Sequence, residues 1–378
     1  MPDLGISSIA AIFSLNYLVT LIILTATFAL FSLGLNLQWG YTGLINFGHI
    51  AFMTVGAYTT VLLSQKGVPL ILAVVVGSGV AALLGLAIGL STLRLREDYL
   101  AIVTIGVSEV VRLIALNEEW LTGGTRGVYS YPLPLENFTR PTLGTKYFLI
   151  GIWTVIFATA GWQLWHWLRR RLQREEKRAG TIGILWSIST AVFGFVLYGA
   201  GVAALYDYSY QAGLMLLVVL LLALVDWRLE VLARSPWGRV LKAIREDEDV
   251  AKALGKNVFW YKLQALMLGG AIAGLAGAFY AWNLTFINPE GFIPLITFQA
   301  WTIVVLGGAG NNTGTILGAT IFWLYNTVTR FALPALVPLD ESRLGALRVM
   351  VIGLILIILM MVRPQGILGN KEELTLGR

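Results

Sequence analysis

The chain has 378 residues, carries a net charge of +6 and contains no cysteine, while 57% of its residues are hydrophobic and only 13% are charged. A mean hydropathy of +0.75 is too high for a soluble domain, whose surface must face water. The lack of cysteine excludes disulfides, thiolate nucleophiles and cysteine metal sites. The basic residues are spread among loops, which argues against a nucleic-acid surface.

Apolar segments recur along the chain at the length that crosses a membrane. A helix of about 20 residues spans a hydrocarbon layer of ~30 Å, and we count roughly ten or eleven such segments. Because lipid cannot satisfy backbone polar groups, these segments should be helices. The predicted fold is an all-α, polytopic transmembrane helical bundle that forms a single domain over residues 1–378. The segments cover residues 17–37, 49–63, 69–93, 99–116, 147–168, 182–205, 213–232, 261–284, 298–306, 315–333 and 344–362, of which the second and the ninth are short and can be broken or re-entrant.

Two glycine-rich stretches interrupt the apolar pattern at membrane depth, one at residues 40–49 (GYTGLINFGH) and one at residues 307–314 (GGAGNNTG). Both combine helix-breaking glycine with asparagine, whose side chain can satisfy exposed backbone groups. Paired interruptions in the two halves of a transporter indicate inverted repeats and the translocation path. Tight helix packing or an ordinary turn explains them equally well. The candidate pathway residues are Gly40, Gly43, Asn46, Gly48, His49, Gly308, Gly310, Asn311 and Asn312.

Two opposite charges lie inside the segment at residues 99–116. Glu109 and Arg112 are three residues apart, so they can meet on one face of a helix. An ionised side chain at the bilayer centre costs about 2.5–3.5 kcal/mol on insertion scales, so such groups usually face protein or water. We expect a structural ion pair, and a substrate or proton site is the alternative.

The positions of lysine and arginine predict the orientation in the membrane. If the basic loop at residues 169–180 is cytoplasmic, alternation places residues 94–96, residues 228–262 and the C-terminal tail on the same side. Most of the basic residues of the chain fall in these regions. The chain should therefore lie in a plasma membrane, with its C-terminus in the cytoplasm and its N-terminus outside.

A charged, amphipathic island at residues 233–260 separates two apolar segments. Its apolar residues recur at roughly helical spacing, while Arg245 with Asp249 and Glu248 with Lys252 can form exposed ion pairs. The island is predicted to be a cytoplasmic docking surface. A solvated helical loop explains the same pattern at least as well when the island is considered alone.

No catalytic chemistry is indicated by the sequence. The chain has no Gly-x-x-x-x-Gly-Lys-[Ser/Thr] phosphate loop, so it should not hydrolyse ATP itself. The neighbouring acidic residues 246–249 point around a helix and are usually solvated, so they do not predict a metal site. His49 and His166 are far apart in sequence, and no cluster of histidines or carboxylates suggests an enzyme. We therefore expect no catalytic residue, no cofactor and no metal in this chain.

Several ordered motifs resemble those of one family. They are GYTGLINFGH at residues 40–49, GAY at 56–58, DYLAIVT at 98–104, LTGG at 121–124 and SPWGRVLKAIR at 235–245. Together they are similar to the LivM-type permeases, which are membrane subunits of ABC importers for branched-chain and other amino acids. The chain departs from that family in a longer region at residues 151–212.

The resemblance implies a complex in the inner membrane of a prokaryote. In that family a second related permease subunit completes the pore, two cytoplasmic ATPase subunits bind the ATP, and a periplasmic binding protein delivers the substrate. The ATPases dock on cytoplasmic coupling helices. In this chain the resemblance assigns Gly238, Arg239, Ala243, Arg245, Ala251 and Gly255 to the ATPase-coupling segment or its edge.

Other functions remain open on the sequence alone. A urea or short-amide ABC permease would have a similar sequence. An ion-coupled secondary transporter that uses Glu109 as a proton or cation site is an alternative of a different class, and it would need an ion gradient and no ATPase.

Overall fold

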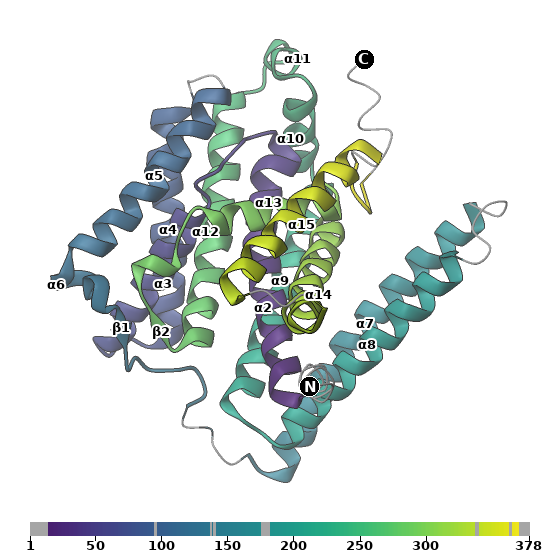
Figure 1. Cartoon of the computed structure of the whole chain (residues 1–378). Coiled ribbons are helices and arrows are strands. Elements are labelled where there is room, and N and C mark those ends of the chain that lie inside the picture. The colour runs from purple at the N-terminus through teal and green to yellow at the C-terminus, as the bar shows by residue number, and fades with distance from the viewer. Residues whose placement is uncertain are drawn as a thin grey trace. The chain divides into compact units, whose positions relative to one another are not determined.

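The structure is a computed structural model that describes residues 14–93, 97–136, 138, 141–174, 182–336, 340–362 and 365–369. Helices make up most of the described backbone, and the strands within it are a pair of two-residue strands (Figure 1). The chain divides into two compact units, one of Met1–Ile23 with Leu135–Ala223 and one of Leu24–Pro134 with Leu224–Arg378. The predicted all-α helical fold is confirmed.

The elements of the first half of the chain are α2 (Leu15–Leu35), the π-helix η1 (Asn36–Gly40), α3 (Ile50–Gln65), α4 (Leu70–Thr92), α5 (Glu97–Asn117), α6 (Glu119–Thr122), the 3-10 helix η2 (Gly124–Arg126), β1 (Val128–Tyr129), α7 (Leu143–Arg174) and α8 (Ile182–Tyr206). Those of the second half are α9 (Tyr210–Arg234), α10 (Pro236–Glu246), α11 (Glu248–Ala253), α12 (Val258–Leu284), β2 (Phe286–Ile287), the 3-10 helix η3 (Pro289–Gly291), α13 (Leu295–Gly307), α14 (Asn312–Leu336) and α15 (Glu341–Val362).

Seven segments among the described residues are long and apolar enough to cross a membrane. Each predicted apolar range falls on a helix, and the short second and ninth ranges lie on α3 and α13. The ninth is longer than predicted, because η3 and α13 together form one of the seven segments. These segments are Leu15–Gly40, Leu70–Thr92, Tyr99–Asn117, Tyr210–Arg234, Val258–Leu284, Pro289–Gly307 and Arg343–Val362, and the shorter apolar helices are Ile50–Gln65, Leu143–Thr159 and Gly194–Tyr206.

The predicted basic loop at residues 169–180 is helical in its first part, because α7 continues to Arg174. Residues 175–181 lie outside the described residues, as do both ends of the chain. The predicted sides of the two termini therefore stay predictions.

Helix α12 packs against α3 and α4 through small residues in the second unit. A Cβ atom on Gly56 of α3 would overlap the backbone of Gly274, and one on Gly277 would overlap the carbonyl of Met53. On the α4 side, a Cβ atom on Gly85 would lie 3.0 Å from the carbonyl oxygen of Leu266. Small residues allow such close approach of helix backbones. The glycines of α12 therefore have a packing role.

The two ends of α12 carry different structures. Its first turn follows α11, whereas its last turn leads into β2, which pairs antiparallel with β1 through Val128 opposite Ile287 and Tyr129 opposite Phe286. A helix of this length rises by about 40 Å, so these structures lie at opposite ends of the unit (Figure 1). Helix α11 and the β-pair therefore lie at opposite ends of α12.

Candidate functional site

The first break departs from regular α-helix at Asn36, before the first glycine of the predicted stretch, Gly40. Helix α2 passes into the π-helix at Asn36, and the regular helix ends near Gly43, whose φ is +75°. Its last turns are closed by hydrogen bonds from Gly43 N to Trp39 O at 2.9 Å and from Leu44 N to Gln38 O at 3.0 Å. Single π turns inside helices are frequent at functional sites. Residues 43–49 then run without regular helix to the start of α3.

The second break separates α13 from α14. Gly308 and Gly310 have φ values of +112° and +79°, which favour glycine. The Asn311 Oδ1 atom accepts a hydrogen bond from Gly314 N at 2.9 Å and so satisfies a free donor at the start of α14. The Asn311 Nδ2 atom donates to Leu368 O at 2.9 Å, which ties the C-terminal segment to this break.

The two breaks meet in the fold. Gly310 N donates to the Asn36 Oδ1 atom at 2.8 Å, and the Asn36 Nδ2 atom donates to the Asn312 Oδ1 atom at 3.1 Å. A Cβ atom on Gly40 would overlap both Gly310 N and the Asn36 side chain. The glycines thus allow direct contact between two backbones that are 270 residues apart in sequence. The structure thus brings the two predicted interruptions into direct contact.

A second set of amides continues from this contact. The Asn46 Nδ2 atom donates to the Gln38 Oε1 atom at 2.9 Å, and the Gln38 Nε2 atom donates to Leu266 O of α12 at 3.1 Å. The Asn46 Oδ1 atom accepts from Gly48 N at 2.9 Å, while its carbonyl accepts from the Trp301 indole at 3.0 Å. Buried polar groups need such partners, and each bond contributes about 0.5–1.5 kcal/mol net.

Gly48 and His49 fix the first break against the neighbouring helices. A Cβ atom on Gly48 would overlap the carbonyl of Thr104 in α5. The His49 Nε2 atom lies 3.0 Å from Phe31 O, and the imidazole packs 4.7 Å from the Phe31 ring between centroids. At the start of α3, Ile50 N donates to the Thr297 hydroxyl at 3.0 Å. His49 therefore belongs to the packed core.

The amides at the breaks are buried in this conformation, except that of Asn311, which is partly exposed. The exposed fractions are 0% for Asn36, Gln38 and His49 and 2% for Asn46 and Asn312. If the breaks line a path, the structure captures that path closed.

The island forms two short helices joined at Asp247. The Ser235 hydroxyl caps α10 by accepting from Gly238 N at 3.4 Å. The Asp247 Oδ1 atom caps α11 by accepting from Asp249 N at 2.9 Å and from Val250 N at 3.0 Å. We refer to residues 235–255 as the α10–α11 segment.

One face of the α10–α11 segment is anchored to the rest of the unit. Leu241, Ile244 and Ala251 are at most 3% exposed. The Lys262 Nζ atom of α12 lies 2.5 Å from the Glu248 Oε2 atom, and the predicted Glu248–Lys252 pair is confirmed at 3.1 Å. Burial by itself raises the pKa of the Glu248 carboxyl, but the hydrogen bonds from Lys262 and Lys252 outweigh it and hold that pKa below its usual value.

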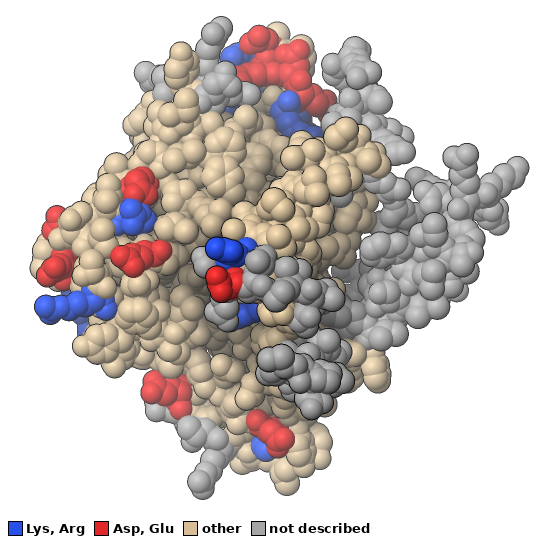
Figure 2. Space-filling view, in the orientation of Figure 1, with Lys and Arg blue, Asp and Glu red and all other residues tan. Residues whose placement is uncertain are grey.

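The other face of the segment is open. Arg239, Ala243 and Gly255 are exposed, whereas Gly238 and Ala251 are buried and can only shape the segment from within. Exposed apolar side chains at Val250 and Leu254 lie among charged residues at this end of the unit, and Figure 2 shows acidic and basic side chains gathered there. An apolar patch rimmed by charges is typical of a protein-binding surface.

Arg245 is the member of the island that turns inward. Its Nη1 atom donates to Gly40 O at 2.5 Å, and a Cβ atom on Gly310 would lie 2.8 Å from the same nitrogen. A Cβ atom on Gly43 would lie 3.7 Å from Arg245 Cγ. The sequence predicts that Arg245 is exposed, whereas the structure places it partly buried, against both breaks. Its predicted ion pair with Asp249 stays a prediction.

The predicted pair on α5 is formed. The Arg112 Nε atom donates to both carboxylate oxygens of Glu109, at 3.1 and 3.0 Å, and the two side chains lie one helical turn apart. Since both oxygens of Glu109 are engaged by one guanidinium, the pair has the geometry of a structural ion pair.

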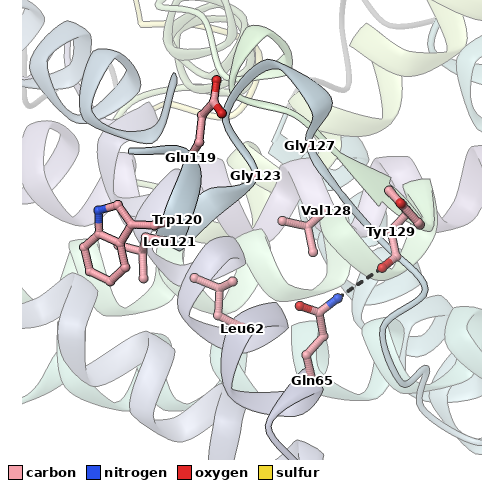
Figure 3. Close-up of a pocket in the computed structure, with 9 residues that line it drawn as sticks. All are labelled: Leu62, Gln65, Glu119, Trp120, Leu121, Gly123, Gly127, Val128 and Tyr129. Atoms are coloured by element: carbon pink, nitrogen blue, oxygen red, sulfur yellow. Dashed lines mark hydrogen bonds between the residues drawn. The ribbon is translucent and has the colours of Figure 1, made fainter. Parts of the chain in front are cut away.

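An open pocket of about 360 Å³ lies near the β-pair, at the end of the unit away from the α10–α11 segment. Figure 3 shows Leu62 and Gln65 of α3 facing the loop that carries Gly127 to Tyr129, and Gln65 donates to Tyr129 O at 3.1 Å. Trp120 stands beside it with 81% of its surface exposed. The described residues contain no group of three or more metal-ligating side chains.

The sequence did not identify Asn36, Gln38 or Trp301, although all three hold the breaks together. Asn36 and Gln38 could have been found from the sequence, because polar amides at the end of an apolar range need buried hydrogen-bond partners. Trp301 could not have been found in this way, since tryptophan is common near a membrane surface.

Comparison with known proteins finds a family that covers most of the chain. A family model described as "Branched-chain amino acid transport system / permease component" matches residues 17–360. The chain is 30% identical over 347 residues to the high-affinity branched-chain amino acid transport system permease protein LivM of Escherichia coli (strain K12), an alignment that covers 91% of this chain and 68% of that protein. It is 25% identical over 353 residues to the probable branched-chain amino acid transport permease protein LivM of Methanocaldococcus jannaschii, with 91% of each chain covered. No solved structure matches the chain significantly.

A shorter similarity links the chain to a different permease. It is 30% identical over 139 residues to the high-affinity branched-chain amino acid transport system permease protein LivH of Escherichia coli (strain K12), covering 36% of this chain and 41% of that protein. The family model spans both glycine breaks and the α10–α11 segment. With its long apolar helices the chain is a multi-pass membrane protein. It belongs to the family of permease components of branched-chain amino acid transport systems.

Proposed function

We propose that the chain is a permease subunit of an ATP-driven importer of amino acids with branched or other hydrophobic side chains. The similarity over 91% of the chain to a permease named for high-affinity branched-chain amino acid transport carries this proposal. The chain acts as a transport subunit and not as an enzyme, because the ATP is hydrolysed by partner subunits.

Two cytoplasmic ATPase subunits supply the energy, and one of them docks on the open face of the α10–α11 segment. Exposed Arg239, Ala243, Val250 and Leu254 offer apolar contact beside charge, as a soluble protein partner requires. The buried face of the segment is anchored by Leu241 and by the Lys262–Glu248 ion pair. A force on the open face is therefore passed to the unit beneath it.

A second, related permease subunit completes the pore, which the similarity of this chain to both LivM and LivH supports. The opposite end of the unit, with α6 and the β-pair, receives a periplasmic binding protein. The pocket beside Trp120 lies at that end. By alternation from the basic cytoplasmic regions, this end is extracytoplasmic.

The two breaks act as the closed constriction of the path. Separation of Asn36 from Gly310 and Asn312 would open it, at the cost of hydrogen bonds that water can replace. ATP-driven movement then shifts the population between closed and open packings.

Purification of the chain from its native membrane in mild detergent, with mass spectrometry of the proteins that co-purify, tests this function. We expect a second permease and nucleotide-binding ATPases. A chain that stays alone and still transports would point to an ion-coupled carrier. A chain purified after deletion of residues 235–255 is the control, because it should lose the ATPases.

A further inference from the structure

The inner face of α10 carries a cation at the place where the two glycine breaks touch. Arg245 lies one residue after the buried Ile244, in the last turn of α10. Its Nη1 atom donates to the carbonyl of Gly40 at 2.5 Å. That carbonyl ends the π-helix, where intrahelical donors run out, so a charged donor is well placed to satisfy it.

The same guanidinium reaches the second break. A Cβ atom on Gly310 would lie 2.8 Å from Arg245 Nη1 and 2.9 Å from Gly40 O. Gly310 N is held by the Asn36 side chain, which belongs to the same π turn as Gly40. Arg245, Gly40 and Gly310 therefore form one contact among α10, the end of η1 and the loop before α14.

Helix α10 is stiff enough to transmit a displacement. It is capped by Ser235 at its start, and the following α11 is fixed to α12 through Glu248 and Lys262. Lys242 makes a second contact with the first break, because its Nζ atom lies 5.8 Å from the centre of the Tyr41 ring.

We infer that Arg245 is a positioning residue that joins α10 to both glycine breaks, so that the three move as one body when an ATPase displaces the α10–α11 segment. This inference rests on the proposed function, in which the segment is the ATPase dock. Arg245 itself then contributes little to docking. Its planar guanidinium offers several donors in a fixed geometry, which a lysine ammonium does not reproduce.

The test compares Arg245→Ala and Arg245→Lys with the matched control Arg234→Ala in the purified importer complex, reconstituted in lipid vesicles. Arg234 is a nearby basic residue whose side chain is 79% exposed and pairs with Glu230 at 2.7 Å. Three quantities are measured: the amount of ATPase that co-purifies, the rate of ATP hydrolysis, and leucine uptake per ATP hydrolysed.

We expect both Arg245 variants to keep their ATPases and to lose about tenfold in uptake per ATP, within the range of coupling between sites. Arg234→Ala should match the wild type. Normal uptake per ATP in Arg245→Ala would overturn the inference. Loss of the ATPases from both Arg245 variants would overturn it too, since Arg245 would then be a docking residue, whereas wild-type protein without ATPases would refute the proposed function instead.

A crosslink provides a test that does not depend on the folding of Arg245→Ala. The chain contains no cysteine, so Tyr41→Cys with Lys242→Cys forms a unique pair across the same contact. If α10 and the first break move together, joining this pair with a short bifunctional thiol reagent leaves uptake intact and restores part of the uptake lost in Arg245→Lys. Loss of uptake on crosslinking would show that α10 and the break must separate, and would overturn the inference.

Discussion

Gly40 and Gly310 allow the backbones of the two breaks to come into contact, because a Cβ atom at either position would overlap atoms of the other break. A Cβ atom on Gly40 would overlap Gly310 N, which is backbone, and the Asn36 amide, which two hydrogen bonds hold in place. The hydrogen bonds of Asn36 depend on this approach. The contact between the breaks therefore requires the absence of side chains at these two positions, and hydrogen bonds of buried amides stabilise it.

Gly40→Ala should therefore destabilise the protein by about 1–3 kcal/mol, which is typical of overpacking, and reduce uptake. Gly79→Ala is the matched control, because nothing lies within 4 Å of a Cβ atom at that position in α4. It should be neutral or slightly stabilising. Thermal unfolding in detergent measures both, and equal midpoints for the two variants would contradict the contact between the breaks.

Asn36 and Asn312 should show energetic coupling. Removal of the Asn36 amide leaves the partly buried Gly310 N–H without its acceptor, which costs about 1–3 kcal/mol. In a double-mutant cycle of Asn36→Ala and Asn312→Ala we expect a coupling energy of about 0.5–3 kcal/mol, as for residues in one network. Strictly additive losses of stability would show that the bond between the two amides contributes nothing.

At the scale of elements, the α10–α11 segment shows what could be predicted from sequence. Its amphipathic spacing predicted a charged face and the Glu248–Lys252 pair, both of which depend on residues close in sequence. Its inward Arg245 could not be predicted, because local periodicity says which face is apolar and not which carbonyl lies opposite. The glycine and asparagine pattern likewise predicted both breaks, whereas their contact depends on long-range packing, in which η1 lies against α12 and α13 lies against α14.

The cap of α11 gives a prediction for this element. Asp247→Ala removes the acceptor for Asp249 N and Val250 N and should cost about 1 kcal/mol locally. Hydrogen exchange of the α11 amides should rise accordingly. Asp249→Ala is the control, since its side chain is 94% exposed and its pair with Lys252, at 3.5 Å, is worth little.

The pH dependence of the segment follows from Glu248. Because the folded-state pKa of this carboxyl is lowered, its stabilisation is present above the ordinary carboxyl pKa and is lost as the pH falls through the lowered value. Hydrogen exchange of α10 and α11 should be steady near neutral pH and accelerate in acid. Glu248→Gln should exchange faster at neutral pH and respond less to acid, and an unchanged pH profile would contradict the assigned Lys262 and Lys252 contacts.

At the scale of the whole molecule, the fold class and the family could be predicted because composition and ordered motifs extend along most of the chain. Charge bias predicts the sides of the membrane, and α12 separates the charged α10–α11 segment from the β-pair and the pocket beside Trp120. This separation suits a permease that is driven from one face and loaded from the other.

Uptake of radiolabelled leucine into vesicles that contain the purified complex tests the central claim most directly. ATP is supplied on the side of the α10–α11 segment and the binding protein on the other. We predict uptake that requires ATP, is competed by isoleucine and valine, and is insensitive to urea. Uptake that needs an ion gradient and no ATP, or that urea competes while isoleucine does not, would contradict an ATP-driven permease for branched-chain amino acids.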